Sequence, residues 1–172
     1  MRKLLAIIIG LFLAITSVTA IADYTVDKGP IRVNSPQDIV LTLSEDPTMK
    51  PEVACLVLTM GQFLRSSSPK VNVTLFLKND GVKLADFETV SSVSDLCMTQ
   101  QDEVTLEDNL ELFLAGNPNN MVNCPICWYE HFGDQKWYYG FYPDSDDPLE
   151  IQQAIQEAIR LLLLSADKVI DF

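Results

Sequence analysis

The fold of this chain is decided by the stretch VNVTLFLKNDG, residues 71–81. Its first part, Val71 to Leu77, is rich in β-branched and apolar side chains and predicts a buried strand. The Asn79-Asp80-Gly81 triplet that follows is a turn signal and would suit a hairpin. The next residues, Val82 to Phe87, have helical rather than strand character. We therefore predict that a strand, a loop and a helix follow one another here.

The same alternation continues on both sides of this stretch. Alternating strands and helices favour a parallel sheet that is covered by helices on both faces, so we predict a three-layer α/β fold. We assign no regular structure to residues 88–104, which are polar and poorly periodic. The expected strands cover residues 38–43, 71–77, 121–126 and 168–172, and the expected helices cover residues 51–65, 105–115 and 148–164.

The N-terminal residues have the features of a secretory signal peptide. Arg2 and Lys3 form a positive start, and residues 4–18 are almost unbroken apolar sequence. Ala20-Ile21-Ala22 supplies the small residues that signal peptidase requires, so we predict cleavage before Asp23. An uncleaved anchor helix is the alternative, but the apolar stretch is short for a membrane span.

Cleavage at this point sets the domain organisation. Residues 1–22 are the predicted signal peptide, residues 23–36 form an extended lead-in, and residues 37–172 form one domain. We expect the mature protein to be periplasmic or secreted, with no membrane attachment after cleavage. Removal of residues 1–22 takes away two basic residues, which changes the formal charge from −12 to −14. Such an acidic chain repels nucleic acid phosphates, so we expect no nucleic acid partner.

All four cysteines lie in the predicted mature domain. Export would place them where disulfides persist, and the sequence does not choose among the possible pairings. Cys55 lies among apolar residues of an expected helix, and we predict an inert thiol in the core. Cys124 and Cys127 form a Cys-x-x-Cys motif near the end of an expected strand. Two thiols at this spacing can form a disulfide, bind a soft metal or carry sulfur.

Three motifs, in this order, resemble the DsrE/DsrF-like (YchN-like) family. The strand and loop of the family resemble residues 71–85, VNVTLFLKNDGVKLA. Its cysteine-bearing strand end resembles residues 124–127, CPIC, and its closing strand resembles residues 165–170, SADKVI. The resemblance covers about residues 37–172, and the aromatic and acidic residues 128–147 have no recognised counterpart. It implies a small flavodoxin-like sheet and assembly into homo- or hetero-oligomers.

The resemblance also implies a function. Characterised members of the family carry sulfur as a protein-bound persulfide and pass it between partner proteins. A single cysteine at the matching strand end is their carrier, and this role would fall to Cys124. The resemblance thus implies a sulfur-relay or thiol-redox protein that needs no cofactor and whose partner is a sulfur donor or acceptor protein.

This chemistry requires a reactive Cys124 thiolate. Loop amides or a following helix N-terminus would lower the pKa of Cys124, and its thiolate would attack sulfur. Cys127 would then resolve the adduct by forming a disulfide with Cys124. The alternative is an inert structural disulfide, or a Cys127 side chain that only contributes to packing.

The second hypothesis is a non-catalytic, oligomeric binding module that holds zinc or copper. Cys97, Cys124, Cys127 and His131 have the chemistry of tetrahedral metal ligands. His131 is the only histidine of the chain, and an ordinary surface position beside the neighbouring aromatic residues is its alternative.

Two further features belong to the expected site. Strand ends of a parallel sheet form a crevice, which would bring the Asn79-Asp80-Gly81 triplet close to Cys124. We expect turn chemistry from this triplet, with some contribution to the wall of the crevice. The aromatic residues 128–142 either dock a partner or bury against the chain's own sheet.

Overall fold

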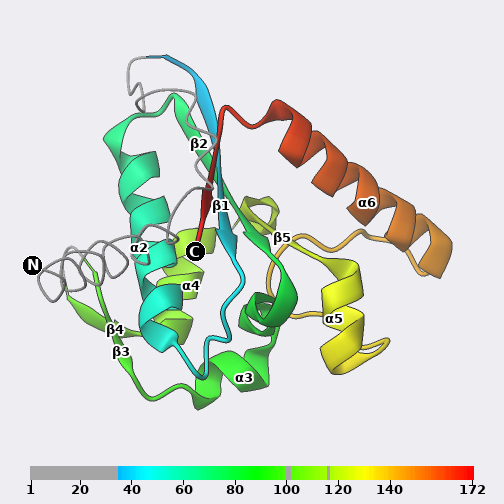
Figure 1. Cartoon of the computed structure of the whole chain (residues 1–172), viewed down its shortest axis with the longest axis horizontal. Coiled ribbons are helices and arrows are strands. Elements are labelled where there is room, and N and C mark those ends of the chain that lie inside the picture. The colour runs from blue at the N-terminus through cyan, green and yellow to red at the C-terminus, as the bar shows by residue number, and fades with distance from the viewer. Residues whose placement is uncertain (1–34, 100–101, 116) are drawn as a thin grey trace, which may run out of the picture.

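In the computed structural model of this chain, a four-stranded sheet forms the middle layer (Figure 1). All neighbouring strands are parallel, so their carboxyl ends meet at one edge. The strand predicted for residues 71–77 is confirmed residue for residue, and those predicted for 38–43 and 168–172 are confirmed within one residue at each end. The order across the sheet is β5 (Met121–Asn123), β2 (Val71–Leu77), β1 (Gln37–Leu43) and β6 (Lys168–Asp171).

The structure describes residues 35–99, 102–115 and 117–172. The predicted signal peptide (1–22) and the lead-in up to residue 34 therefore lie outside the described residues. None of the described helices combines the length and the apolar character that a membrane crossing requires.

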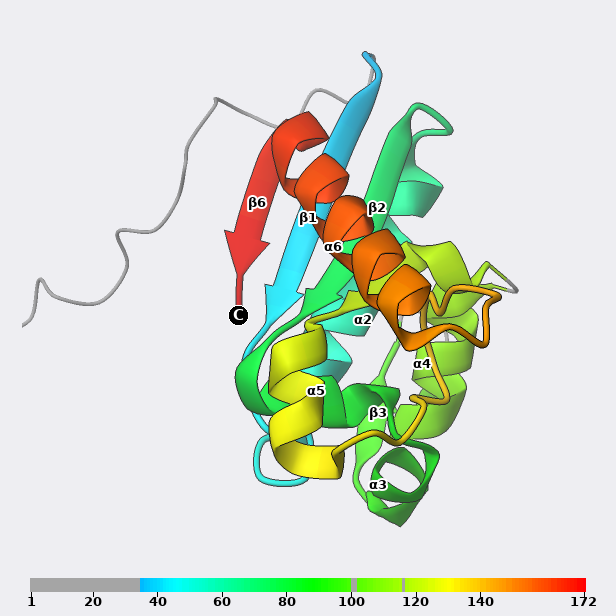
Figure 2. The same ribbon diagram turned by 90° about the vertical axis from the view of Figure 1, so that its right-hand side faces the viewer.

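Helices cover the sheet on both faces, which confirms the predicted three-layer α/β architecture. Figure 1 shows α2 and α4 on one side of the sheet and α5 and α6 on the other. In Figure 2, α6 runs diagonally across its face, while α5 lies beyond the carboxyl ends of the strands. The bounds are Pro51–Ser67 for α2, Leu106–Leu114 for α4, Pro125–Phe132 for α5 and Pro148–Ser165 for α6.

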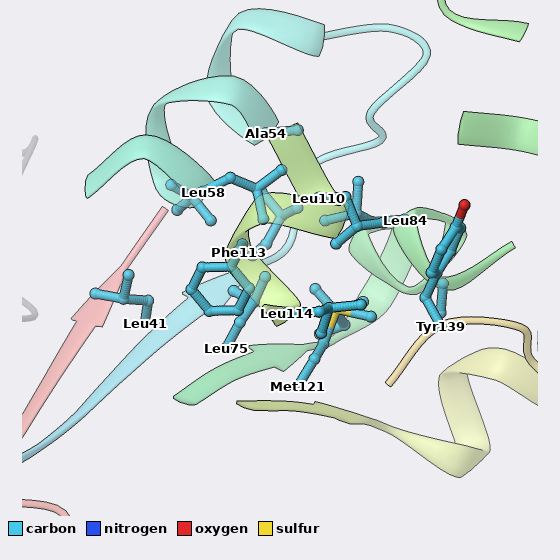
Figure 3. Packing of buried hydrophobic residues seen from close by; sticks show 14 of the residues in the cluster. Leu41, Ala54, Leu58, Leu75, Leu84, Leu110, Phe113, Leu114, Met121 and Tyr139 are labelled. Atoms are coloured by element: carbon cyan, nitrogen blue, oxygen red, sulfur yellow. The ribbon is translucent and has the colours of Figure 1, made fainter. Parts of the chain in front are cut away.

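The largest part of the core lies between the sheet, α2 and α4 (Figure 3). Leu41 and Leu75 of the strands are fully buried there, together with Phe113 of α4. Burial of each such side chain contributes about 2 kcal/mol to stability. At Gly61 of α2, a Cβ atom would lie 2.4 Å from the Phe113 ring, so glycine allows the two helices to approach closely.

Residues 88–104 differ from the prediction, because they contain regular structure. Helix α3 (Phe87–Ser92) leads into an antiparallel pair of short strands, β3 (Leu96–Met98) and β4 (Glu103–Thr105). Cys97 of β3 is buried and forms a disulfide with Cys55 of α2. The prediction of an inert Cys55 thiol is therefore wrong, and the bond ties the hairpin to α2.

The strand expected for residues 121–126 is also shorter than predicted. It ends at Asn123, and helix α5 begins at Pro125. Proline fits the first position of a helix because its fixed φ is helical and the amide proton that it lacks would have no helical acceptor there. The Cys-x-x-Cys motif consequently stands at the start of a helix, with Cys124 as the junction between strand and helix.

Candidate functional site

The carboxyl edge of the sheet brings together the segments that follow β2 and β5. The backbone N–H of Cys124 donates to the carbonyl of Leu77 at 2.9 Å, which fixes Cys124 at the end of β2. The 3₁₀ helix η1 (Asn79–Ala85) follows β2 and contacts α5. The structure thus places the Asn79-Asp80-Gly81 triplet and the Cys-x-x-Cys helix side by side, as the sequence predicted.

The turn at the start of η1 depends on glycine. A Cβ atom on Gly81 would lie 2.1 Å from the carbonyl oxygen of Leu43, at the end of β1. The Gly81 N–H donates to the carbonyl of Ser44 at 3.1 Å, and Asn79 adopts a left-handed conformation with φ of 51°. Asn79 and Gly81 therefore have the predicted turn roles, and they hold η1 against the neighbouring strand.

Cys124 caps helix α5. Its Sγ accepts a hydrogen bond from the backbone N–H of Cys127 at 3.4 Å, in the way that a serine or aspartate oxygen caps other helices. Both Cys124 and Cys127 are free thiols, and both are half-buried. The two sulfur-bearing residues thus meet in one helical turn, where a disulfide between them closes a short ring.

The acidity of Cys124 differs from the prediction. Burial raises the pKa of the Cys124 thiol to about 11, and the neighbouring Cys127 thiol adds to this effect. The backbone N–H groups of Cys127 and Ile126 act in the opposite direction, but they do not outweigh burial. The expected lowering of the pKa is therefore wrong for the free dithiol, in which Cys124 is protonated at neutral pH.

A chain of close polar contacts continues from α5 across the carboxyl edge. Cys124, Cys127 and His131 are three and four residues apart, so they share one face of α5. The Nε2 atom of His131 lies 3.2 Å from Oδ1 of Asp80, and that oxygen is 2.9 Å from Nζ of Lys83. Asp80 therefore connects η1 to the face of α5 that carries the thiols.

Lys83 extends this chain to the end of β1. Its Nζ atom lies 2.6 Å from Oδ2 of Asp46, which follows that strand. Burial acts to raise the pKa of Asp46, but hydrogen bonds from Lys83 and Thr48 outweigh it and lower the pKa below the usual 3.8. Lys83 and Asp46 were missed in the sequence. The position of Asp46 soon after a predicted strand was a signal that would have found it, whereas Lys83 had no such signal.

A buried amide adjoins Cys124 on its other side. Asn123 is fully buried, and its Nδ2 atom donates to the carbonyl of Tyr139 at 3.2 Å. Within the part of the chain that the structure describes, nothing donates to Asn123 Oδ1. An unpaired buried acceptor is uncommon in proteins, and here it lies directly before the candidate carrier residue.

Comparison with known proteins identifies the fold. No family model and no curated protein sequence matches the chain. The crystal structure of the YchN protein from E. coli matches it with a TM-score of 0.51 and 20% sequence identity, over 79% of this chain and 99% of that one. This chain has the YchN fold. The flavodoxin-like fold that the three sequence motifs implied is thereby confirmed.

The YchN-like fold explains where the site lies. In open sheets of parallel strands, ligands bind beyond the carboxyl ends of the strands. Cys124, Asp80 and Asp46 each follow a different strand at that edge of the sheet. Three loops of this chain therefore supply one candidate site, although they are far apart in the sequence.

The structure does not assemble the predicted metal ligands. Cys97 is bound to Cys55 in the disulfide, and the ring of His131 faces Asp80. Across residues 35–99, 102–115 and 117–172, no group of three or more His, Cys, Asp or Glu side chains is placed to hold a metal ion. The four-ligand set that includes Cys97 is therefore wrong, since a disulfide sulfur is not a thiolate ligand.

The aromatic segment 128–142 is buried in part, as one of the two alternatives from the sequence predicted, and docking of a partner stays a prediction. Trp128, Trp137 and Tyr139 are buried against the domain, and the Trp128 and Phe132 rings stack at 4.1 Å. Tyr129 and Tyr138 are exposed. Together with α6, part of this segment borders a groove of about 600 Å³ that the sequence did not predict.

Proposed function

We propose that this protein is a thiol-exchange protein that carries sulfur on Cys124 and uses Cys127 to resolve the adduct. The observation that carries the proposal is the contact between two free thiols at the carboxyl edge of the sheet. The other two cysteines form the Cys55–Cys97 disulfide. The chain thus separates a structural cysteine pair from a pair that is available for chemistry.

Loading is a transfer of one sulfur atom. The Cys124 thiolate attacks the outer sulfur of a donor persulfide, R–S–SH, and the donor S–S bond breaks. The donor leaves as a thiolate and takes up the proton that Cys124 released, and Cys124 becomes a persulfide. An acceptor thiolate then attacks the outer sulfur of this persulfide and restores the Cys124 thiol.

Resolution releases the carried sulfur and leaves the two cysteines oxidised to a disulfide. The Cys127 thiolate attacks Sγ of the Cys124 persulfide and expels hydrosulfide. The two cysteines lose two electrons as they form a disulfide, and the departing sulfur gains them. A dithiol reductant is required to return the pair to the free state. Cys127 is close enough for this step, because its side-chain thiol already interacts with the Cys124 thiol.

We also propose a location and a mode of assembly. The signal-peptide pattern predicts a periplasmic or secreted protein, and the Cys55–Cys97 disulfide supports an oxidising compartment. Homo- or hetero-oligomers remain the expected form. Leu56 on α2 supports this expectation, since it is exposed beside Leu96 and Met98 of β3, which are also exposed.

Intact-mass spectrometry after exposure to inorganic polysulfide tests the carrier role. We expect a gain of one or more sulfur atoms that is removed by reduction and is absent in Cys124→Ser. Cys127→Ser is the matched control, and it should retain the added sulfur longer because the resolving thiol is missing. A Cys124–Cys127 disulfide that resists reduction, or loading that persists in Cys124→Ser, contradicts the proposal.

A further inference from the structure

The groove between α5, residues 133–142 and α6 has an apolar floor. Its volume of about 600 Å³ is typical of sites for organic ligands and far exceeds the volume of a sulfur atom or a metal ion. The aromatic and aliphatic side chains that line it are Trp128, Tyr129, Trp137, Tyr142, Ile151 and Ile155.

Amide side chains supply the polar part of the groove. Gln135, Gln152 and Gln156 line it, and each side chain offers two N–H donors and a carbonyl acceptor. A polypeptide backbone presents the complementary groups at every residue. Apolar pockets combined with neutral amides suit an extended peptide, whose backbone pairs with the amides while its side chains enter the floor.

The rim of the groove is acidic. Asp134 lines the groove, and the sequence on either side of its lining residue Pro148 carries Asp144, Asp146, Asp147 and Glu150. Lys136 is the one basic residue between positions 133 and 151, and its Nζ atom lies over the Tyr142 ring at 4.4 Å. The carboxylates in and beside this lining therefore favour a cationic partner over an anionic one.

The groove also adjoins the candidate site. Pro125 and Ile126, which lie between the two cysteines, form part of its lining. We propose that the groove binds a short segment of the partner protein in which bulky apolar side chains alternate with lysine or arginine. This inference rests on the proposed function, because it assigns the groove to the protein that exchanges sulfur with Cys124.

A binding experiment that needs no thiol chemistry tests this inference. Both tryptophans of the chain, Trp128 and Trp137, line the groove, so their fluorescence reports on its occupant. The probe is acetyl-Lys-Leu-Ser-Phe-Lys-amide, which contains no cysteine. We expect a saturable change in emission, and binding about tenfold weaker when glutamate replaces both lysines of the probe.

Two variants of α6 provide a matched pair. Gln152 lines the groove, whereas the adjacent residue Gln153 does not, and both side chains are exposed. Gln152→Arg should weaken binding of the basic peptide about tenfold, because it places a cation in the groove and removes an amide. Gln153→Arg adds the same charge outside the groove and should leave the affinity within about twofold.

Three results overturn the inference: no saturable change with the basic peptide, equal affinity for the acidic peptide, or equal effects of the two variants. Tryptophan emission that changes with protein concentration alone, together with dimers in sedimentation, assigns the groove to a second copy and also overturns it. Inorganic polysulfide is a small anion, so loading of Cys124 with it requires no peptide in the groove. Failure of this binding test with normal loading is therefore distinct from failure of the proposed function.

Discussion

The backbone N–H of Cys127 donates to Sγ of Cys124 at 3.4 Å, so a thiol caps a helix where a hydroxyl or carboxylate usually does. The residue that we assign as sulfur carrier therefore also stabilises the helix that holds its partner thiol. Serine is a better cap than cysteine, because a hydroxyl oxygen accepts hydrogen bonds more strongly than sulfur does.

This contact predicts how substitutions of Cys124 affect stability. Cys124→Ser should keep the free energy of unfolding or raise it by up to about 1 kcal/mol, whereas Cys124→Ala should lie about 1 kcal/mol below Cys124→Ser. Urea denaturation measures both values. If the alanine variant is as stable as the serine variant, the cap does not contribute. A stable Cys124→Ser protein also ensures that lost sulfur loading reflects chemistry rather than unfolding.

The reactivity of Cys124 should depend strongly on pH. The thiolate is the reacting form, and the raised pKa of about 11 leaves Cys124 almost fully protonated at neutral pH. We expect the rate of Cys124 alkylation by iodoacetamide to rise about tenfold per pH unit, with its midpoint near pH 11 rather than near the ordinary 9.0. Peptide mapping after timed alkylation follows this rate.

Cys127→Ser provides the control for the pH profile. Loss of the neighbouring thiol should lower the pKa of Cys124, while burial keeps that pKa above its ordinary value. A midpoint at or below pH 9.0 in the wild-type protein contradicts the environment described for Cys124.

Lys83 should contribute more to stability than an ordinary surface lysine. It bridges Asp46 and Asp80, and only 24% of its side chain is exposed. Lys83→Met should lower the free energy of unfolding by about 2 kcal/mol at neutral pH, since it leaves the Asp46 carboxylate, whose side chain is 18% exposed, without a cation. Lys50→Met is the control, because the Lys50–Glu45 pair is exposed and should contribute less than about 1 kcal/mol.

The effect of Lys83→Met should also depend on pH. The pKa of Asp46 is lowered in the folded protein, so its contribution is complete above the unfolded value of 3.8 and is lost as the pH falls through the folded-state pKa. The stability difference between wild type and Lys83→Met should therefore shrink in acid. If the stability difference between the two proteins stays constant from neutral pH to below 3.8, the stabilising effect of Lys83 does not come from its ion pair with Asp46.

The Cys55–Cys97 disulfide should stabilise the domain without taking part in sulfur transfer. It joins residues 42 positions apart, so its removal in Cys55→Ser/Cys97→Ser should cost about 2–4 kcal/mol, as thermal or urea unfolding will show. Polysulfide loading of Cys124 should remain at the wild-type level. Loss of loading in a folded double variant would mean that the two cysteine pairs exchange with each other.

The sequence predicted those elements in which local pattern and tertiary structure agree. Val71–Leu77 forms β2 as expected, because its β-branched residues suit a strand and its alternate side chains are buried. Pro51 and Pro148 start helices that the apolar spacing predicts. Pro125 also starts a helix, but this start was not predicted. The short apolar run from residue 121 favoured a strand that continued to residue 126.

Other features depend on contacts that the sequence does not specify. The strands β3 and β4 have only three residues each. The disulfide between Cys97 and Cys55 holds them against α2, and the sequence did not determine which cysteine pairs with Cys97. The raised pKa of Cys124 has the same origin, since burial of the thiol follows from packing. Sequence alone located the two thiols but did not determine their environment.

The position of β1 between β2 and β6 has a consequence for how the chain acquires its structure. β1 pairs with β2, which follows it in the chain after the single helix α2. Its other partner is β6, in which Lys168 pairs with Ile39 of β1 across a sequence separation of 129 residues. An emerging polypeptide can form the first pair early, yet the second edge of β1 stays open until residues 168–171 are present. Contacts of such long sequence separation slow folding, so closure of the sheet should be a late step.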